Sequence, residues 1–140
     1  MKKILGGLLT ILLFSCGAKQ TISEKERPLY EILTQQNDGG ASIRFYEILT
    51  ESREIAMLQN DENLRDKIKP GDINTSNFII LNMGEKPSAG YSITVENVEE
   101  TADKVIVTVK EQEPKGMSAS VITYPYCIVR INSKKQIVIK

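Results

Sequence analysis

Apolar and polar residues alternate along much of the second half of this chain, which is typical of β-strands. Residues 104–110 place Val105, Val107 and Val109 on one side, and residues 91–96 and 136–140 show the same period of two. Residues 78–81 form an unbroken apolar run and are a further strand candidate. The pattern predicts a mainly β-structured domain.

Two turn sequences predict hairpins between neighbouring strands. Residues 37–40 read Asn-Asp-Gly-Gly and separate apolar residues 29–33 from residues 41–49, in which Ile43, Phe45 and Leu49 are expected to face the core. Residues 84–91 separate the run at 78–81 from the alternating residues that follow. In that connection Gly84 and Gly90 allow positive φ angles and Pro87 restricts its own φ, so we expect a stiff, exposed hairpin loop.

One stretch between the strands changes to a helical period. Ile55, Met57 and Leu58 follow Thr50 and Ser52, whose hydroxyls suit the start of a helix, so residues 51–59 are predicted to be helical. Pro125 lies within the apolar residues 121–131 and marks an edge, a bulge or a change of sheet. The predicted fold class is mainly β (α+β), a small antiparallel sandwich or open barrel with one short helix near its start.

The first 16 residues have the character of an export signal. Lys2 and Lys3 precede the apolar residues 4–14, a run well short of the roughly 20 residues that a membrane-spanning helix needs. Residues 13–16, Leu-Phe-Ser-Cys, resemble a bacterial lipobox. This resemblance implies that Cys16 becomes the first mature residue and carries a diacylglyceryl thioether and an amide-linked acyl chain such as palmitate.

The same features set the expected domain organisation and location. We expect a lipoprotein signal peptide at residues 1–15, a lipid-anchored polar tether at residues 16–27 and a single β-rich domain at residues 28–140. The protein would be held on the cell membrane by the lipid on Cys16. Gly17 replaces the aspartate associated with inner-membrane retention, so the outer membrane is expected if the cell has two membranes.

Composition and charge exclude several functions. The chain has 18 basic and 18 acidic side chains, and removal of Lys2 and Lys3 with the signal leaves a slightly acidic protein without a basic patch for nucleic acid. It contains no histidine. Cys127 falls in period with Val129 and Ile131, which predicts a buried, unreactive thiol. We therefore expect no catalytic residue, no metal site and no cofactor, and a protein that is not an enzyme.

A family resemblance appears at residues 84–93, Gly-Glu-Lys-Pro-Ser-Ala-Gly-Tyr-Ser-Ile, at Pro114, and at residues 123–129, Thr-Tyr-Pro-Tyr-Cys-Ile-Val. Over residues 78–140 the chain resembles the C-terminal domain of the PrcB family of protease-complex subunits. The resemblance implies an exported lipoprotein that binds and stabilises a secreted protease without being the protease itself. The expected contact residues are turn residues and tyrosines that form a partner-binding rim: Lys86, Pro87, Ser88, Gly90, Tyr91, Tyr124, Pro125 and Tyr126.

A second resemblance points to another class of protein. Residues 87–91, 115–118 and 124–126 look like the three loops of chagasin-type cysteine-protease inhibitors. Here Lys86 replaces the family's asparagine, the second loop has a single glycine, and no tryptophan is present. An inhibitor that binds protease active sites is therefore an alternative function.

Three hypotheses remain open at the level of sequence. The first is a membrane-anchored binding module for an exported protease or other envelope protein, the second is an inhibitor, and the third is an envelope lipoprotein of unrelated structural role. In the third, residues 84–91 are only a connection. Tyr91 shares a face with Ile93 and Val95, so it is the contact residue that could instead belong to the core.

Overall fold

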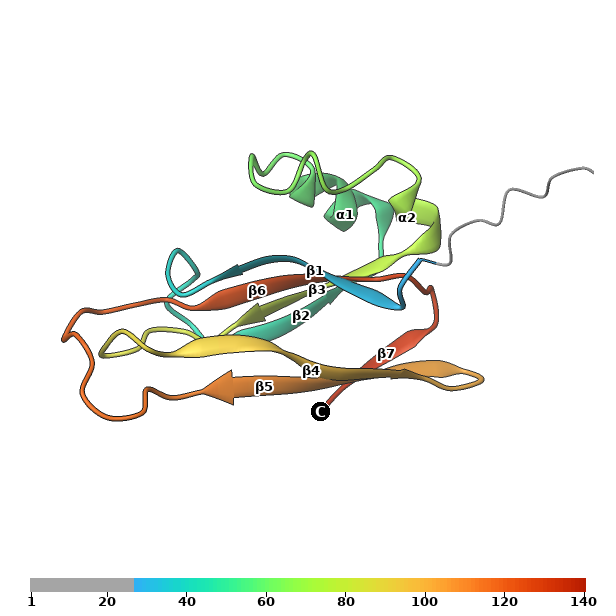
Figure 1. Ribbon diagram of the computed structural model, residues 1–140. Helices are drawn as coiled ribbons and strands as arrows, with labels where there is room; N and C mark the ends of the chain where they lie inside the picture. Colours follow the sequence, from blue (N-terminus) through green and yellow to red (C-terminus); the bar gives the residue numbers. More distant parts are fainter. Residues whose placement is uncertain (1–26) are drawn as a thin grey trace, which may run out of the picture.

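The computed structural model describes residues 27–140, which form two stacked β-sheets with a helical layer on the outer face of one sheet (Figure 1). The first sheet has the strand order β1 (Tyr30–Gln36), β6 (Tyr126–Ile131), β3 (Asn77–Asn82) and β2 (Phe45–Leu49). The second sheet has the order β4 (Ser92–Glu100), β5 (Lys104–Gln112) and β7 (Gln136–Ile139). The mainly β fold class is confirmed, and its form is a sandwich rather than a closed barrel. The predicted signal peptide and lipidated Cys16 lie outside the described residues.

The first sheet is buried on both faces, which explains the apolar run in β3. Ile79 and Leu81 point toward the second sheet and belong to the main core, whereas Phe78 packs in a second core beneath the helices. Strand β6 divides in the same way: Cys127 and Val129 face the main core and Ile128 the second core. The central strands therefore need apolar residues at successive positions, not only at alternate ones.

The predicted helix is confirmed as α1 (Ser52–Leu58), with Ile55 and Leu58 buried in the second core. Its cap differs from the expected hydroxyl. The carboxylate of Glu54 accepts hydrogen bonds from the backbone N–H groups of Thr50 (3.1 Å) and Glu51 (3.2 Å). A glutamate that reaches back in this way satisfies N–H groups that the first turn leaves free.

A short helix, α2 (Asp72–Thr75), is fastened to the first sheet by buried charge. Arg130 of β6 donates hydrogen bonds from Nη1 to Asp72 Oδ2 (3.0 Å) and to the Lys67 carbonyl oxygen (2.9 Å), and it pairs with Glu31 of β1. Arg27 also pairs with Asp72, at 3.1 Å. Burial alone would raise the pKa of Asp72, but the backbone N–H of Lys69 and the two arginines outweigh it and lower the pKa. The carboxylate thus stays ionised and ties the helical segment to β6.

Both predicted hairpins are wrong, the first because β1 and β2 never pair. They lie at opposite edges of the first sheet, separated by β6 and β3, and residues 37–44 cross the end of the sheet between them. Each strand instead pairs with a strand far away in sequence, β1 with β6 and β2 with β3. Leu49 is buried as expected and Phe45 is half-buried, but Ile43 is 73% exposed because the crossing segment holds it outside both cores.

Residues 84–91 likewise connect two sheets and not two paired strands, since β3 lies in the first sheet and β4 in the second. The positive φ angles are confirmed, at 80° for Gly84 and 94° for Gly90. A Cβ atom on Gly90 would lie 2.6 Å from Cβ of Pro114, and one on Gly84 would lie 2.9 Å from the backbone nitrogen of Arg44. Both glycines are thus required by the backbone and by close neighbours.

The C-terminal strands contain two further details. Pro125 lies directly before β6, and its carbonyl oxygen accepts a hydrogen bond from the backbone N–H of Met83 (3.0 Å). Strand β7 pairs with β5 in parallel, with Lys104 opposite Gln136, although we expected antiparallel pairing throughout. Residues 132–135 carry the chain from the first sheet to the second, so this crossover sets the direction of β7.

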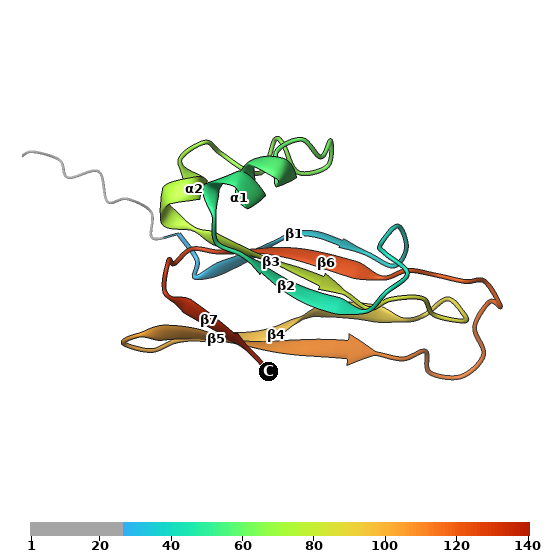
Figure 2. The same ribbon diagram turned by 180° about the vertical axis from the view of Figure 1, so that it is seen from behind.

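The chain enters at one end of the sandwich, and long connections lie at the other. The described chain enters at one end, where Asn132 donates hydrogen bonds to the carbonyl oxygens of Pro28 and Leu29, and three long connections gather at the other end (Figure 2). In the range 27–140, no helix is long and apolar enough to cross a membrane.

Candidate partner-binding rim

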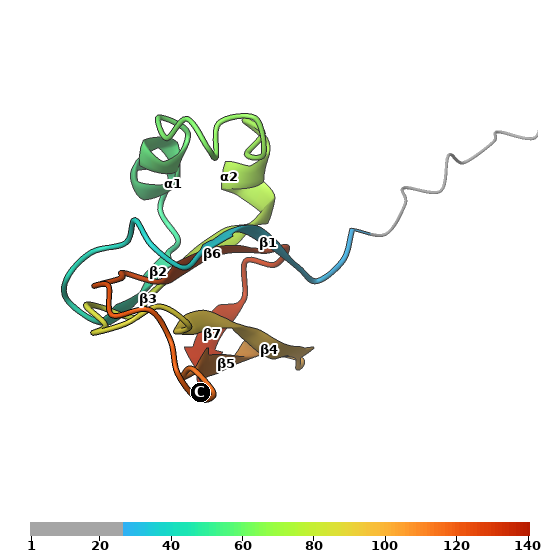
Figure 3. The same cartoon turned by 60° about the vertical axis from the view of Figure 1, so that its left-hand side comes forward.

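Three connections meet at the end of the sandwich remote from the chain's entry: residues 37–44, 84–91 and 113–125. We call these the rim loops, and Figure 3 shows them coming together beside β2 and β3. Lys86 and Thr123 form an antiparallel bridge, with N–H to carbonyl distances of 2.8 and 3.0 Å. Further backbone hydrogen bonds join the loops from Ala89 to Ala119 (3.0 Å), Glu85 to Ser42 (3.0 Å) and Gly40 to Tyr124 (2.8 Å).

Side chains reinforce these backbone bonds around Ser88. The Thr123 hydroxyl donates to the Ser88 carbonyl oxygen (2.9 Å), and the Ser118 hydroxyl donates to Ser88 Oγ (3.1 Å). The Ser88 hydroxyl itself donates to the Ala89 carbonyl oxygen (3.1 Å). The amine of Lys86 lies 5.5 Å from the ring centre of Tyr91 in a cation–π arrangement. Ser88 is therefore a structural residue of the rim, bonded on both sides.

The tyrosines expected at the contact differ in their burial. Tyr124 is half-exposed: its backbone N–H donates to Asp38 Oδ1 (3.0 Å) and its hydroxyl donates to Glu85 Oε2 (3.4 Å). Desolvation and the neighbouring Glu85 carboxylate raise the pKa of this hydroxyl. Tyr91 is partly buried against the main core and Tyr126 against the second core. These two rings close the ends of the cores while part of each stays at the surface.

The remaining predicted contact residues also divide by exposure. Pro87 and Gly90 are exposed, and Lys86 is half-exposed. Pro125 is buried because the chain passes beneath the rim before it enters β6. The structure thus brings the two predicted loops together, but Pro125 is buried and no partner can reach it without a change of structure.

The most exposed apolar side chains of the rim were missed. Six large apolar side chains are exposed within residues 27–140, and four of them lie in the rim loops: Ile43 (73%), Met117 (105%), Val121 (51%) and Ile122 (54%). Because the three loops are hydrogen-bonded to one another, these exposed apolar residues make the rim a candidate interaction site. The available signal was Met117, a large apolar residue within the polar residues 113–120, whereas Val121 and Ile122 continue into the apolar run that leads to β6.

The base of the rim is braced by a polar cluster at the side of the sandwich. Glu111 at the end of β5 accepts hydrogen bonds from Arg44 Nε (3.1 Å) and from the Tyr46 hydroxyl (2.6 Å). The Arg44 guanidinium also lies 4.7 Å from the centre of the Tyr46 ring. Burial and the Glu111 carboxylate raise the pKa of Tyr46 to about 12, so its hydroxyl stays protonated and keeps donating across the sheets.

Residues 27–140 contain one cysteine, Cys127. Cys127 is fully buried, as expected, and burial raises the pKa of its thiol to about 12. Among residues 27–140, no three His, Cys, Asp or Glu side chains are grouped so that they could hold a metal ion.

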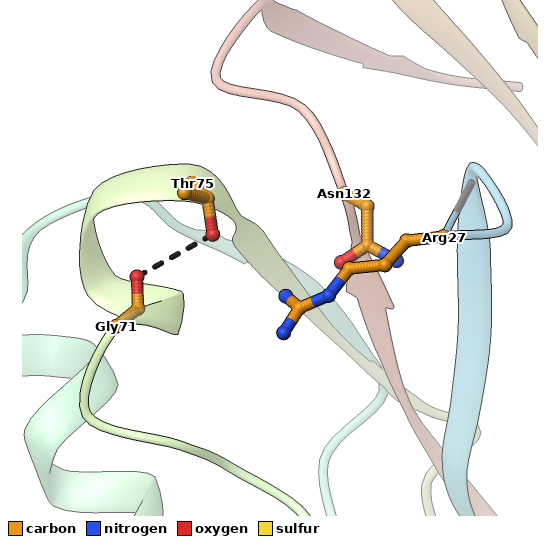
Figure 4. Close-up of a pocket in the computed structure, with 4 residues that line it drawn as sticks. All are labelled: Arg27, Gly71, Thr75 and Asn132. Carbon is orange, nitrogen blue, oxygen red and sulfur yellow. Dashed lines mark hydrogen bonds between the residues drawn. The ribbon is translucent and has the colours of Figure 1, made fainter. Parts of the chain in front are cut away.

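A pocket of about 330 Å³ lies at the opposite end, beside α2 (Figure 4). Its walls include Arg27, Gly71, Thr75 and Asn132. Arg27 is paired with Asp72, Thr75 donates to the Gly71 carbonyl oxygen (3.4 Å), and Asn132 both accepts from Ser76 and donates to Pro28. The polar groups of this pocket are therefore engaged in holding the helical segment and the entering chain.

Residues 77–132 match the family model described as PrcB C-terminal. This segment is a PrcB-like C-terminal domain. It contains β3 to β6 and two of the three rim loops, whereas residues 37–44 lie outside the match. The PrcB family suggests a subunit associated with a protease complex, and the domain is of a non-catalytic, accessory type.

The chain is also similar to a protein of Methanocaldococcus jannaschii that is named only as uncharacterized. The two are 44% identical over 55 residues, which amount to 39% of this chain and 34% of the relative. The chain thus spans about a third of the length of the curated relative that it matches. No solved structure matches the chain.

Proposed function

We propose that this protein is a lipid-anchored, non-catalytic subunit that binds an exported protease, or another envelope protein, through the rim and stabilises it. The observation that carries the proposal is the exposure of Ile43, Met117, Val121 and Ile122 on the rim loops, two of which belong to the PrcB-like domain. These side chains would be buried by a partner, and the half-exposed Tyr124 and Lys86 would contact it at the edge.

The bonding of the rim supports binding without large rearrangement. Each loop is tied to another by backbone hydrogen bonds, and the Lys86–Thr123 bridge and the Ser88 contacts lie at the centre. A surface that is ordered before binding loses less conformational entropy when a partner docks. The rim therefore suits a stable complex better than a loosely held loop would.

The polarity of the fold is consistent with anchoring at the N-terminal side. Strand β1 starts at Tyr30, opposite Ile131, and runs to Gln36, opposite Tyr126 beside the rim. Seven residues of strand correspond to about 20 Å. If Cys16 carries lipid, the rim lies at the end of the domain farther from the point where the tether enters, so it would face away from the bilayer.

Capture by the full chain tests the proposal, in mild detergent because of the apolar residues 4–14. Wild-type protein should recover a protease from an envelope extract, and that protease should keep its activity longer with the chain than alone. Ile122→Asp should weaken capture at least tenfold. Met57→Asp is the matched control, since Met57 is similarly exposed (67%) but lies on α1, away from the rim. Equal capture by both variants would show that the rim is not the binding surface.

A chagasin-like inhibitor is the second candidate, favoured by one observation. Ser118 of residues 115–118 donates a hydrogen bond to Ser88 Oγ of residues 87–91 (3.1 Å), so two of the three loops of that resemblance lie side by side. Dose-dependent inhibition of a recovered cysteine protease would support it, whereas a longer active lifetime supports the accessory subunit. Failure to recover any protease would favour an envelope lipoprotein of unrelated structural role.

A further inference from the structure

The side of the sandwich between β2 and β7 holds an open pocket of about 360 Å³. Ile48 of β2 and Ile137 of β7 form apolar walls, Asn77 of β3 lines the pocket, and Lys134 and Lys135 lie at its border. The pocket lies toward the start of β3, whereas the rim lies toward the end of that strand. It is therefore separate from the proposed partner-binding surface.

One buried polar atom in this pocket lacks a partner. Asn77 is 3% exposed, its Nδ2 makes one long hydrogen bond to the Lys135 carbonyl oxygen (3.5 Å), and its Oδ1 has none. Asn82, at the other end of the same strand, is 1% exposed, and its buried amide group is fully hydrogen-bonded. Its amide group makes three short hydrogen bonds of 2.6 to 2.9 Å to the backbone of Ala41 and Ile43. A buried acceptor without a donor is costly, so Asn77 Oδ1 points to a donor that the described chain does not supply.

The positive charges at the border are already engaged, which argues against an anion. The Lys134 amine donates to the carbonyl oxygens of Thr50 (3.0 Å), Ser76 (3.1 Å) and Ile73 (3.4 Å), and a lysine has only three N–H groups. The Lys135 amine donates to the Thr101 carbonyl oxygen and pairs with Glu100, both at 2.9 Å. The pocket still offers the Asn77 acceptor and two aliphatic walls, and the Thr50 and Gln136 side chains also line it.

We propose that this pocket binds an extended peptide segment of a partner, which inserts one aliphatic side chain between Ile48 and Ile137 and donates a backbone N–H to Asn77 Oδ1. The position of the pocket favours a peptide over a small molecule. Strands β2 and β7 are outer strands of their sheets, and no strand within residues 27–140 pairs with their outer edges (Figure 2). Such edges accept an added strand through main-chain hydrogen bonds, and pockets between them select its side chains.

Titration of the full chain with a capped tripeptide, leucine between two serines, tests the proposal by NMR. We expect shifts of the Asn77 side-chain amide and of the Ile48 and Ile137 methyl groups, with saturation in the millimolar range. A capped peptide of three serines should produce no such shifts. Asn77→Leu should keep the fold, because it removes the unpaired oxygen at similar volume. It should lower the affinity for the leucine peptide at least fivefold. Asn77→Asp keeps an acceptor and should retain binding.

Three results would overturn this inference. The first is the absence of shifts at these groups, which would mean that water alone satisfies Asn77 Oδ1. The second is equal binding of the two peptides, and the third is unchanged affinity in Asn77→Leu. Ile122→Asp should leave peptide binding unaltered, so failure of the pocket and failure of the rim can be told apart.

Discussion

The contact between Gly90 and Pro114 provides a quantitative test of how the rim is built. Gly90 has a φ of 94°, and a Cβ atom there would lie 2.6 Å from Cβ of Pro114. Gly116 has a similar φ of 88°, but a Cβ atom there would meet nothing within 4 Å. Replacing each glycine by alanine therefore separates backbone strain from a steric clash between two rim loops.

The expected magnitudes follow from these two terms. Alanine at a left-handed φ costs about 1–2 kcal/mol, so Gly116→Ala should lower the free energy of unfolding by that amount. Gly90→Ala should lose the same amount plus about 1–3 kcal/mol for overpacking against Pro114. Because the clash pushes residues 84–91 away from residues 113–125, Gly90→Ala should also weaken partner capture, whereas Gly116→Ala should affect capture far less.

Urea unfolding followed by circular dichroism measures both variants at one pH and temperature. Equal losses of stability would refute the reasoning, because they would mean that Pro114 moves aside without cost and that the two loops are not locked together. A Gly116→Ala variant that is as stable as the wild type would refute the strain term instead.

Three further predictions concern charge, the buried thiol and the anchor. The lowered pKa of Asp72 stabilises the fold above the unfolded carboxyl value of 3.8, and this contribution is lost as the pH falls through the lower folded pKa. Urea titrations of the wild type should therefore show a drop in the free energy of unfolding in that acidic range. Asp72→Asn should lower the free energy of unfolding by about 3–5 kcal/mol at pH 7 and make it depend less on acid pH. If the pH profile of the variant equalled that of the wild type, the role of this carboxylate would be contradicted. Cys127 should resist Ellman's reagent at pH 8 in the native protein and react fully in urea, because burial raises its pKa to about 12; rapid native labelling would contradict its burial. Cys16→Ser should abolish incorporation of labelled palmitate in cells, and undiminished labelling would disprove the lipoprotein hypothesis.

The local pattern of apolar residues predicted the helix and strands of this fold more successfully than it predicted which strands pair. The alternation at Val105 and Val107 placed β5, and the change of period at Ile55 and Leu58 placed α1. Both signals arise from which face of a single element is buried. The turn sequence at residues 37–40 carried an equally local signal, yet it failed because β1 pairs with β6 and β2 pairs with β3, both distant in the chain.

The candidate site shows the same division. The glycines and Pro87 identified residues 84–91 as a constrained loop, and the resemblance paired that loop with residues 123–129. Ile43 was assigned to the core from its apolar character, although the crossing segment places it at the surface. Sequence pattern could not distinguish a buried apolar residue from an exposed one, because the residue type is the same whether the side chain packs in a core or lies at the surface.

The strand-rich class, the short helix, the glycine-bounded loop and the buried cysteine could all be predicted from sequence, since each depends on residues close together in the chain. The pairing of the strands, the parallel direction of β7 against β5 and the meeting of three loops with exposed apolar residues in one rim became visible in the folded domain. Those features depend on contacts between distant residues, such as Lys86 with Thr123, which form only when the whole domain closes around its two cores.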